Sequence, residues 1–282
     1  MAIKTFKPKT ATLRGTKLED RSALKKDGGP RGLTIAKRQK SGRNNQGKVT
    51  IRHRGGGFKR RIRIVDFKRD KHGIPAKVTG FYFDPNRSAH LALLQYADGE
   101  KRYIIAPKDL KEGSTIVSGE KVDLLPGNAM KIENIPSGME VHCVESIPGK
   151  GAVYGRSAGQ VIIVQGKDST GKYVQLKMPS GEIRLVSANS MATIGQVGNE
   201  EKMNVKLGKA GRRRNLGWRP SVRGKVMHPA QHPHGGGEGK GSIGRAKDLW
   251  GNRLHTRTRK NKRTEQYIIK RRRSKTRPFA KK

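Results

Sequence analysis

Short runs of apolar residues recur along the middle of the chain, roughly every 8–12 residues, with turn-forming residues between them. They are rich in Val, Ile, Phe and Tyr and too short for helices, so they predict β-strands. An Asp-Gly pair at Asp98 and Gly99 predicts a tight hairpin turn between two of them. The first set of predicted strands covers residues 61–67, 78–83, 90–96 and 101–106, and a weaker pair follows at 115–117 and 121–125.

The turn-forming residues Pro126, Gly127 and Asn128 separate this first set of apolar runs from a second set. Two sets of about five short strands predict two small barrels, because a closed sheet leaves no exposed edge. We therefore expect an all-β protein with one barrel over residues 61–126 and another over 127–200. The second set of predicted strands covers residues 130–135, 140–145, 161–165, 172–177 and 182–186.

Charge is concentrated outside these barrels. The 282 residues include 63 Lys and Arg against 22 Asp and Glu, a net charge of +41. Residues 1–60 carry +15 and residues 201–282 carry +22, which leaves only +4 on residues 61–200. We call the two charged segments the N-terminal extension (1–60) and the C-terminal extension (201–282). Both are rich in Gly and basic residues, so alone they bury too little apolar surface to offset the entropy of ordering.

A polyanion is the partner that this charge requires, because it would relieve the self-repulsion of a compact state. Nucleic acid fits, since phosphates release condensed counterions when Lys and Arg bind them. A membrane surface fits poorly, because the sequence has no long apolar run and no basic amphipathic helix. We expect no membrane partner.

The single cysteine, Cys143, excludes an internal disulfide and is typical of a reducing compartment. Val141 and Val144 flank it, so we expect a small packed side chain. The N-terminus lacks the apolar run of a secretory signal. Glu19 and Asp20 argue weakly against an organellar transit peptide.

Two arginines of the predicted barrels share one sequence context, Arg-Ser-Ala, at Arg87 and Arg156. A single loop arginine is commonly a solvated charge, but the repeat favours phosphate contact by guanidinium groups. A basic cluster of Lys68, Arg69 and Lys71 is expected to join them.

Three histidines, His228, His232 and His234, lie in a Gly-rich segment. A zinc site is disfavoured, because Pro229 and Pro233 prevent a helix that would align the first two and no cysteine lies nearby. Acid–base catalysis by a histidine is better motivated, yet the sequence offers no nucleophile or second carboxylate beside it. We favour a Gly-rich loop that lies against RNA through its backbone and imidazoles.

Residues 211–220 add an aromatic side chain to a basic run. Trp218 follows Arg212, Arg213 and Arg214 and precedes Arg219, so base stacking and phosphate contact are both expected. Packing of Trp218 against a barrel is the alternative. The sequence matches no P-loop, dinucleotide fingerprint or Ser-His-Asp set.

Four strings together resemble the large-subunit ribosomal protein 2 family in its bacterial form. They are RGGGFKR at 54–60, DPNRSA at 84–89, RPSVRG at 219–224 and HPHGGGEG at 232–239. The resemblance implies an OB-like barrel followed by an SH3-like barrel, with basic extensions buried in rRNA. It also implies a structural constituent of the large subunit that binds 23S-type rRNA and contacts small-subunit rRNA and neighbouring ribosomal proteins. Subunit association, tRNA binding and peptide-bond formation are the steps that such proteins support.

The resemblance raises one further possibility, direct participation of His232 in peptidyl transfer. The family's usual acidic residue just before this histidine is replaced here by Gln231, which removes a natural orienter of the imidazole. We therefore expect no enzyme activity, no cofactor, no metal and no homo-oligomer. A free-standing nucleic-acid binder is the remaining alternative. The expected location is the cytoplasmic ribosome, and the sequence leaves a plastid ribosome open.

The expected RNA contacts are the loop arginines, the basic cluster, and basic, aromatic and histidine side chains of the extensions. They are Arg52, Arg54, Lys59, Arg60, Lys68, Arg69, Lys71, Arg87, Arg156, Arg212, Arg213, Arg214, Trp218, Arg219, Arg223, His228, His232, His234, Lys240 and Arg245.

Overall fold

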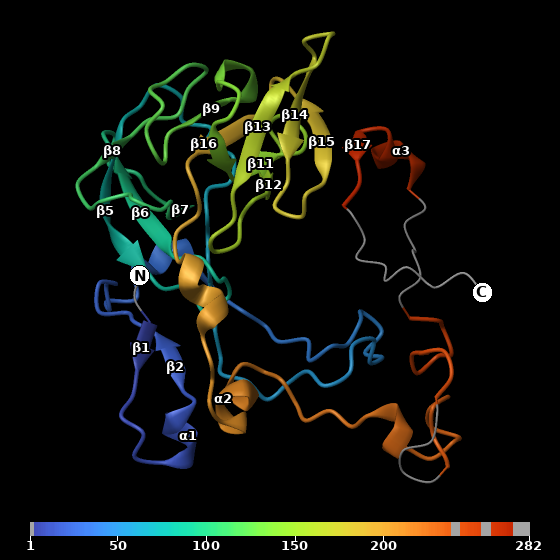
Figure 1. The fold of residues 1–282 in the computed structure, drawn as a ribbon. Coiled ribbons are helices and arrows are strands. Elements are labelled where there is room, and N and C mark those ends of the chain that lie inside the picture. Colours follow the sequence, from blue (N-terminus) through green and yellow to red (C-terminus); the bar gives the residue numbers. More distant parts are fainter. Residues whose placement is uncertain (1–2, 238–242, 255–260, 273–282) are drawn as a thin grey trace. The chain divides into compact units, whose positions relative to one another are not determined.

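The computed structural model describes residues 3–237, 243–254 and 261–272, and Figure 1 shows its strands and short helices. The described chain forms two compact units. The larger unit is built from the residues up to Lys37, from Lys59–Lys209 and from Thr264 onward, and the smaller from Arg38–Phe58 and Ala210–Arg263. Strands predominate, which confirms the all-β fold class. No described helix is long and apolar enough to cross a membrane.

The first barrel contains a four-stranded antiparallel sheet with the strand order β7-β6-β5-β8. Along β5, buried residues alternate with more exposed ones, because one face of the strand packs on the core. Gly99 has φ +85°, and Tyr96 N–H donates to the Glu100 carbonyl at 2.9 Å, so the predicted hairpin is confirmed. The strands are β5 (Ala76–Tyr82), β6 (Leu91–Tyr96), β7 (Lys101–Ile105) and β8 (Thr115–Ile116).

The second barrel is built on a seven-stranded sheet with the order β17-β15-β14-β13-β10-β16-β9. Its core includes the fully buried Ile132, Val141, Ile162 and Leu176. The strands are β9 (Ala129–Lys131), β10 (Glu140–His142), β13 (Ile162–Lys167), β14 (Tyr173–Lys177), β15 (Ile183–Ser187), β16 (Met191–Ile194) and β17 (Ile268–Lys270), beside a separate pair, β11 (Val144–Glu145) and β12 (Ala152–Tyr154). The sequence pattern misses β12 and β16.

The strand predicted at 61–67 is wrong in extent. Only β4 (Arg61–Arg63) is formed, and it pairs with β3 (Thr34–Ala36), whereas Val65 makes an isolated bridge to Tyr103 of β7. The chain turns next, because the Asp66 carboxylate accepts the backbone N–H groups of Lys68 and Arg69 at 3.0 and 2.8 Å.

Three other predicted strands also differ. The run at 140–145 divides at Cys143 into β10 and β11, which lie in separate sheets. Residues 121–125 form none, and Leu124 and Leu125 stay exposed, so nothing there gains from sheet pairing. The run predicted at 130–135 divides into β9 and a 3-10 turn, η2 (Ile132–Asn134), whose Ile132 still packs into the core.

The extensions are largely irregular, as expected, but they also carry regular elements that the sequence does not predict. β1 (Ile3–Thr5) pairs with β2 (Lys17–Glu19) in an antiparallel ribbon. β17 pairs with β15, where Leu185 N–H also donates to the Tyr267 carbonyl at 2.8 Å. The remaining helical turns are α1 (Ala11–Arg14), η1 (Arg31–Leu33), η3 (Glu200–Asn204), α2 (Ala210–Asn215), η4 (Gly224–Val226) and α3 (Lys262–Glu265).

Cys143 lies at the break between β10 and β11 with φ +49° and packs against the core formed around Tyr82 and Tyr103. Burial raises the pKa of its thiol to about 12. The side chain therefore stays protonated, in agreement with the expected packed, unreactive cysteine.

Candidate RNA interface

The two Arg-Ser-Ala loops meet in the larger unit. The Cζ atoms of Arg87 and Arg156 lie 5.1 and 5.2 Å from the centroid of one ring, that of Phe67. Ala158 N–H donates to Ser88 Oγ at 3.1 Å, which joins one loop directly to the other. Two guanidinium groups, one from each barrel, therefore lie at one aromatic side chain, where each gains a cation–π contact.

The buried carboxylate of Asp84 holds the loop that carries Arg87. Asp84 accepts Arg87 Nε–H at 3.1 Å and the backbone N–H of Asn86 at 2.8 Å. Asn86 in turn donates to the Arg61 carbonyl and accepts from Lys37 Nζ. The Arg87 side chain is 27% exposed, so one edge of its guanidinium is fixed while part of it reaches solvent.

A second buried carboxylate supports the same loop from the N-terminal extension. Glu19 lies 2.9 Å from His90 Nε2 and accepts from Lys202 Nζ at 2.8 Å and from Asn199 Nδ2 at 2.7 Å. Asn199 Nδ2 also donates to the Ser88 carbonyl at 2.8 Å. Burial opposes ionisation, but the contacts from His90 and Lys202 outweigh it and hold the pKa of Glu19 at about 2.

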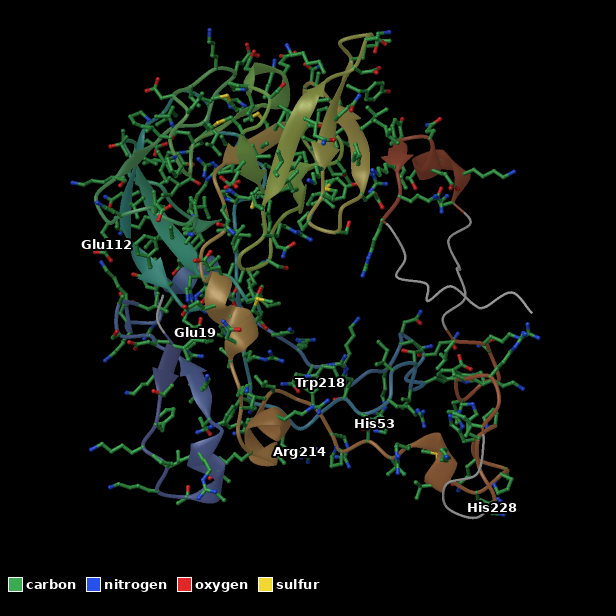
Figure 2. All side chains as sticks on the ribbon, in the orientation of Figure 1. Glu19, His53, Glu112, Arg214, Trp218 and His228 are labelled. Carbon is green, nitrogen blue, oxygen red and sulfur yellow. The ribbon has the colours of Figure 1, made fainter. Side chains whose placement is uncertain are left out.

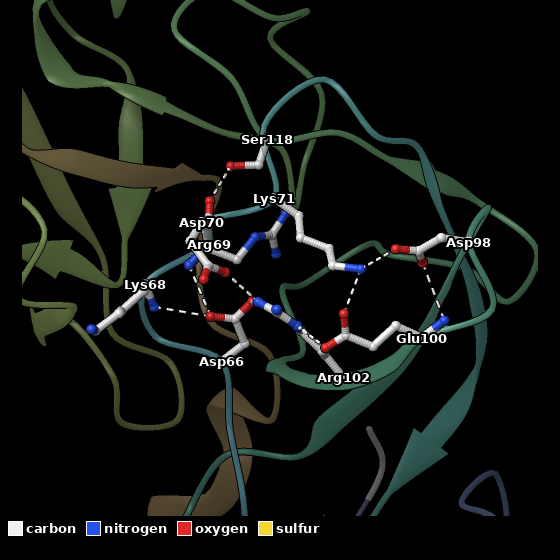
Figure 3. Close-up of polar contacts among 9 residues, drawn as sticks. All are labelled: Asp66, Lys68, Arg69, Asp70, Lys71, Asp98, Glu100, Arg102 and Ser118. Atoms are coloured by element: carbon white, nitrogen blue, oxygen red, sulfur yellow. Dashed lines mark hydrogen bonds and ion pairs between the residues drawn. The ribbon is translucent and has the colours of Figure 1, made fainter.

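The basic cluster at 68–71 does not act as one surface. Arg69 is buried, donates from Nη2 to the Gly127 carbonyl at 3.2 Å, and accepts Ser118 Oγ–H on its own carbonyl at 2.8 Å. Its role here is to tie the first barrel to the segment between the barrels, and burial lowers its pKa. Lys71 bonds to Asp98 and Glu100, so only Lys68 is exposed (Figure 3).

In the smaller unit, residues 54–58 of the RGGGFKR string pack against the end of α2 and the residues that follow it. Gly55 N–H donates to the Gly217 carbonyl at 2.9 Å, and Phe58 N–H donates to the Asn215 carbonyl at 3.0 Å. A Cβ atom added at Gly57 would lie 2.7 Å from Gly217 N, so glycine is required at this close approach. Residues 55–58 and 215–217, which are far apart in the sequence, thus form one local structure.

Trp218 is covered by arginines of this unit rather than by a barrel. The Cζ atom of Arg54 lies 3.4 Å from the indole centroid and that of Arg213 lies 5.4 Å from it. Figure 2 shows Trp218 and Arg214 in this unit. The indole is partly exposed, so it carries cationic groups and leaves limited area for a base.

The histidine loop uses its imidazoles internally. His228 Nδ1 accepts Ala230 N–H at 3.2 Å, His232 Nδ1 accepts His234 N–H at 3.0 Å, and His234 Nε2 accepts Lys247 N–H at 2.9 Å. One ring nitrogen of each histidine is therefore already used as an acceptor within the loop. His232 is only 6% exposed.

Two glycines make this loop possible. A Cβ atom on Gly224 would lie 2.3 Å from His232 Nδ1, and one on Gly235 would lie 2.5 Å from the His228 carbonyl oxygen. Part of the glycine content is therefore needed for packing within the loop. Within the described ranges, no group of His, Cys, Asp or Glu could hold a metal ion.

Two family models match the chain. The model described as Ribosomal Proteins L2, RNA binding N-terminal domain, matches residues 31–118, and the model described as Ribosomal Proteins L2, C-terminal domain, matches residues 125–251. Together they cover well over half of the sequence. The chain belongs to the ribosomal protein L2 family. The L2 family identifies it as an rRNA-binding structural constituent of the large ribosomal subunit that acts in translation.

Each L2 match contains one of the Arg-Ser-Ala loops. Of the sequence-predicted contacts, Arg69 and His232 are buried and Lys240 lies outside the described residues. The partly exposed ones are Arg52, Arg54, Arg60, Lys71, Arg87, Arg212, Arg214 and His234. The exposed ones are Lys59, Lys68, Arg156, Arg213, Trp218, Arg219, Arg223, His228 and Arg245.

Sequence reasoning did not single out four residues on which the arginine loops depend: Phe67, Ser88, Glu19 and Asn199. Ser88 carried a signal, because its Arg-Ser-Ala context occurs twice. The other three carried none, since their contacts join segments distant in sequence. In this L2 protein, these four residues position the loops of Arg87 and Arg156, and that role does not require them to touch RNA.

Proposed function

We propose that this ribosomal protein is a primary 23S-type rRNA binder that fixes RNA segments through its barrels while its extensions supply most of the phosphate contacts. The observation that carries the proposal is the convergence of Arg87 and Arg156 on Phe67. Two guanidinium groups held on a rigid base suit bidentate phosphate contacts that set register on an RNA.

Replacing Arg87 or Arg156 by alanine tests this function. Each variant should bind a 23S-type rRNA fragment about tenfold more weakly, the scale of one charge-assisted hydrogen bond. Lys177→Ala is the matched control, because it removes one exposed positive charge from β14 of the same unit. Circular dichroism should show all three variants folded. Unchanged affinity in both arginine variants would mean that these barrel loops do not bind the RNA and that the barrels serve only as a spacer between the two extensions.

We also propose that the protein contacts small-subunit rRNA and neighbouring ribosomal proteins on a cytoplasmic ribosome, and supports subunit association, tRNA binding and peptide-bond formation. Family membership and the +41 charge support this proposal over a free-standing nucleic-acid binder. Sedimentation of cell extract distinguishes the two. The ribosomal role requires co-migration with large subunits in high salt, whereas release into the free pool would favour the free binder.

For the histidine loop we propose a structural role rather than peptidyl transfer. The supporting observation is that His232 is buried and its Nδ1 already accepts His234 N–H. Subunits assembled with His232→Gln, whose amide oxygen can still accept that N–H, should form peptide bonds at a near-normal rate. A large loss of the chemical step in fully assembled subunits would instead favour direct participation.

A further inference from the structure

The β3–β4 ribbon of the larger unit has two chemically different faces. Its register pairs Thr34 with Arg63, Ile35 with Ile62 and Ala36 with Arg61. Ile64 N–H donates to the Leu33 carbonyl at 2.9 Å, which continues this register beyond the strands. Directly opposed residues of an antiparallel pair share a face, and successive pairs alternate. Within the strands, one face therefore carries Ile35 and Ile62, and the other carries the two arginines. Leu33 and Ile64 adjoin the strand ends and extend the row of apolar side chains.

The apolar face is open to solvent. Ile35 is 56% exposed, Ile62 37% and Ile64 46%, while Leu33 packs partly against the first barrel and anchors the row. Phosphate binding accounts for the arginine face but not for a row of exposed isoleucines on so highly charged a protein. An exposed contiguous apolar surface usually marks a binding site.

A groove continues from this row along the first barrel. It has a volume of 460 Å³, and its apolar wall includes Leu33, Ile64 and Val65. Lys68, Lys101 and Lys150 also line it and are exposed.

Three carboxylates line the same groove, and the cationic side chains paired with them offset part of their charge. Arg102 pairs with Asp66, Asp70 and Glu100, a network drawn in Figure 3. Within the described ranges, the ammonium groups of the three lysines form no ion pair with these carboxylates, so they are available to an anion.

We propose that the apolar face of the β3–β4 ribbon and the adjoining groove seat unpaired RNA bases, with the flanking phosphates on the three lysines. This inference rests on the proposed rRNA binding and assigns it a second kind of contact. An apolar surface gains from covering the faces of splayed-out bases, which a duplex keeps stacked and hidden. The surrounding lysines and arginines match a nucleic acid better than they match a basic protein segment.

The test uses the full chain with Ile35→Thr and Ile62→Thr combined. Threonine keeps the β-branched shape that favours strands but removes apolar area. Binding to a 12-nucleotide oligo(A) should weaken about three- to tenfold, while binding to a 12-base-pair RNA duplex stays unchanged. The slope of log affinity against log salt should not change, because no phosphate contact is lost.

Two controls separate this proposal from general RNA binding. Ile147→Thr, at a position 55% exposed outside the ribbon, should have no effect. Arg61→Ala, on the opposite face, should lower the salt slope by about 0.7, the value for one phosphate of a single strand. Equal weakening of oligo(A) and duplex, or no weakening of either, would overturn the proposal. The Arg87 and Arg156 variants test the proposed function separately.

A crosslink in the assembled large subunit decides between RNA and protein as the occupant. A photoreactive phenylalanine derivative in place of Ile62 should crosslink to bases of single-stranded rRNA. Crosslinks to a ribosomal protein, or to paired rRNA alone, would overturn the assignment.

Discussion

The hydroxyl oxygen of Ser88 accepts a hydrogen bond from the backbone N–H of Ala158 at 3.1 Å, so the arginine loop of one barrel is bonded to the arginine loop of the other. The spacing of Arg87 and Arg156 is thereby fixed by the fold rather than by the RNA. A site whose cations are already in place loses less entropy when it binds.

Ser88→Ala should therefore weaken rRNA binding without removing any charge. The lost hydrogen bond should lower the free energy of unfolding by about 1 kcal/mol, and the affinity for a 23S-type rRNA fragment should fall by less than in Arg87→Ala. Urea denaturation and a filter-binding assay measure the two effects. Ser157→Ala is the control, because the exposed side chain of Ser157 makes no hydrogen bond in the described structure.

Phe67→Leu should reduce the contribution of both arginines at once. Leucine retains much of the apolar volume but lacks the ring over which Arg87 and Arg156 lie. With about 0.5–1 kcal/mol for each of the two cation–π contacts, rRNA affinity should fall roughly five- to thirtyfold. Adding Arg156→Ala to this variant should cost less than the same change in the wild-type protein, as a double-mutant cycle measures. If the losses in affinity from Phe67→Leu and Arg156→Ala were fully additive, Arg156 would not act through the Phe67 ring.

Glu19→Gln should change the acid sensitivity of the protein. The folded pKa of Glu19 is about 2 against 4.5 for the free side chain, so its ionised form contributes stability that is complete above about pH 4.5. As the pH falls from 4.5 towards 2, up to about 3 kcal/mol of unfolding free energy is lost. Glu19→Gln should start less stable and lose less over this window in urea titrations. Glu112→Gln, which removes an exposed carboxylate from the same unit, is the matched control.

His142 should resist protonation in the folded protein. Burial lowers its pKa to about 4, although the hydrogen bond to the Gly195 carbonyl at 2.8 Å favours the charged form. Unfolded chains take up this proton near pH 6.5, so stability should fall as the pH drops from 6.5 to 4. Nuclear magnetic resonance should show an unchanged His142 ring signal from pH 8 to about 5. A pKa of His142 near 6.5 in the folded protein would show that its ring is exposed to solvent.

Gly224→Ala should open the histidine loop. The added methyl group would lie 2.3 Å from His232 Nδ1, so the imidazole must leave its position and release His234 N–H. Hydrogen exchange at His234 should accelerate while exchange in the barrel strands stays slow. Gly211→Ala in α2 is the control, because its added Cβ meets nothing within 4 Å.

The two sets of strands could be predicted from the sequence, because alternating apolar positions record burial on one face of a sheet. Strand extent was less predictable. Residues 61–67 carry a strand-like composition, yet β4 ends at Arg63, Val65 bridges to Tyr103 of β7, and a turn follows at Asp66. The change of partner and the local hydrogen bonds of Asp66 break up the predicted strand, and apolar periodicity reports neither.

The candidate site was predicted in its parts but not in its assembly. Arg87 and Arg156 were found from a repeated string, whereas their common contact with Phe67 depends on the docking of two barrels. Arg69 lies in a run of charged residues, a pattern typical of an exposed segment. Its burial depends on a long-range hydrogen bond to the Gly127 carbonyl, which the sequence does not reveal. His228, His232 and His234 each accept a local backbone hydrogen bond, and such bonds leave no trace in composition.

The pairing of β17 with β15 has a consequence for biogenesis. Ile183 and Arg184 receive their partner strand from residues near Ile268, which leave the ribosome about 80 residues later. At roughly 5–20 residues per second, the edge of this sheet stays uncapped for several seconds or longer during synthesis. An uncapped strand offers unpaired backbone groups to other chains, so the nascent protein passes through a stage that invites aggregation before its own tail protects it.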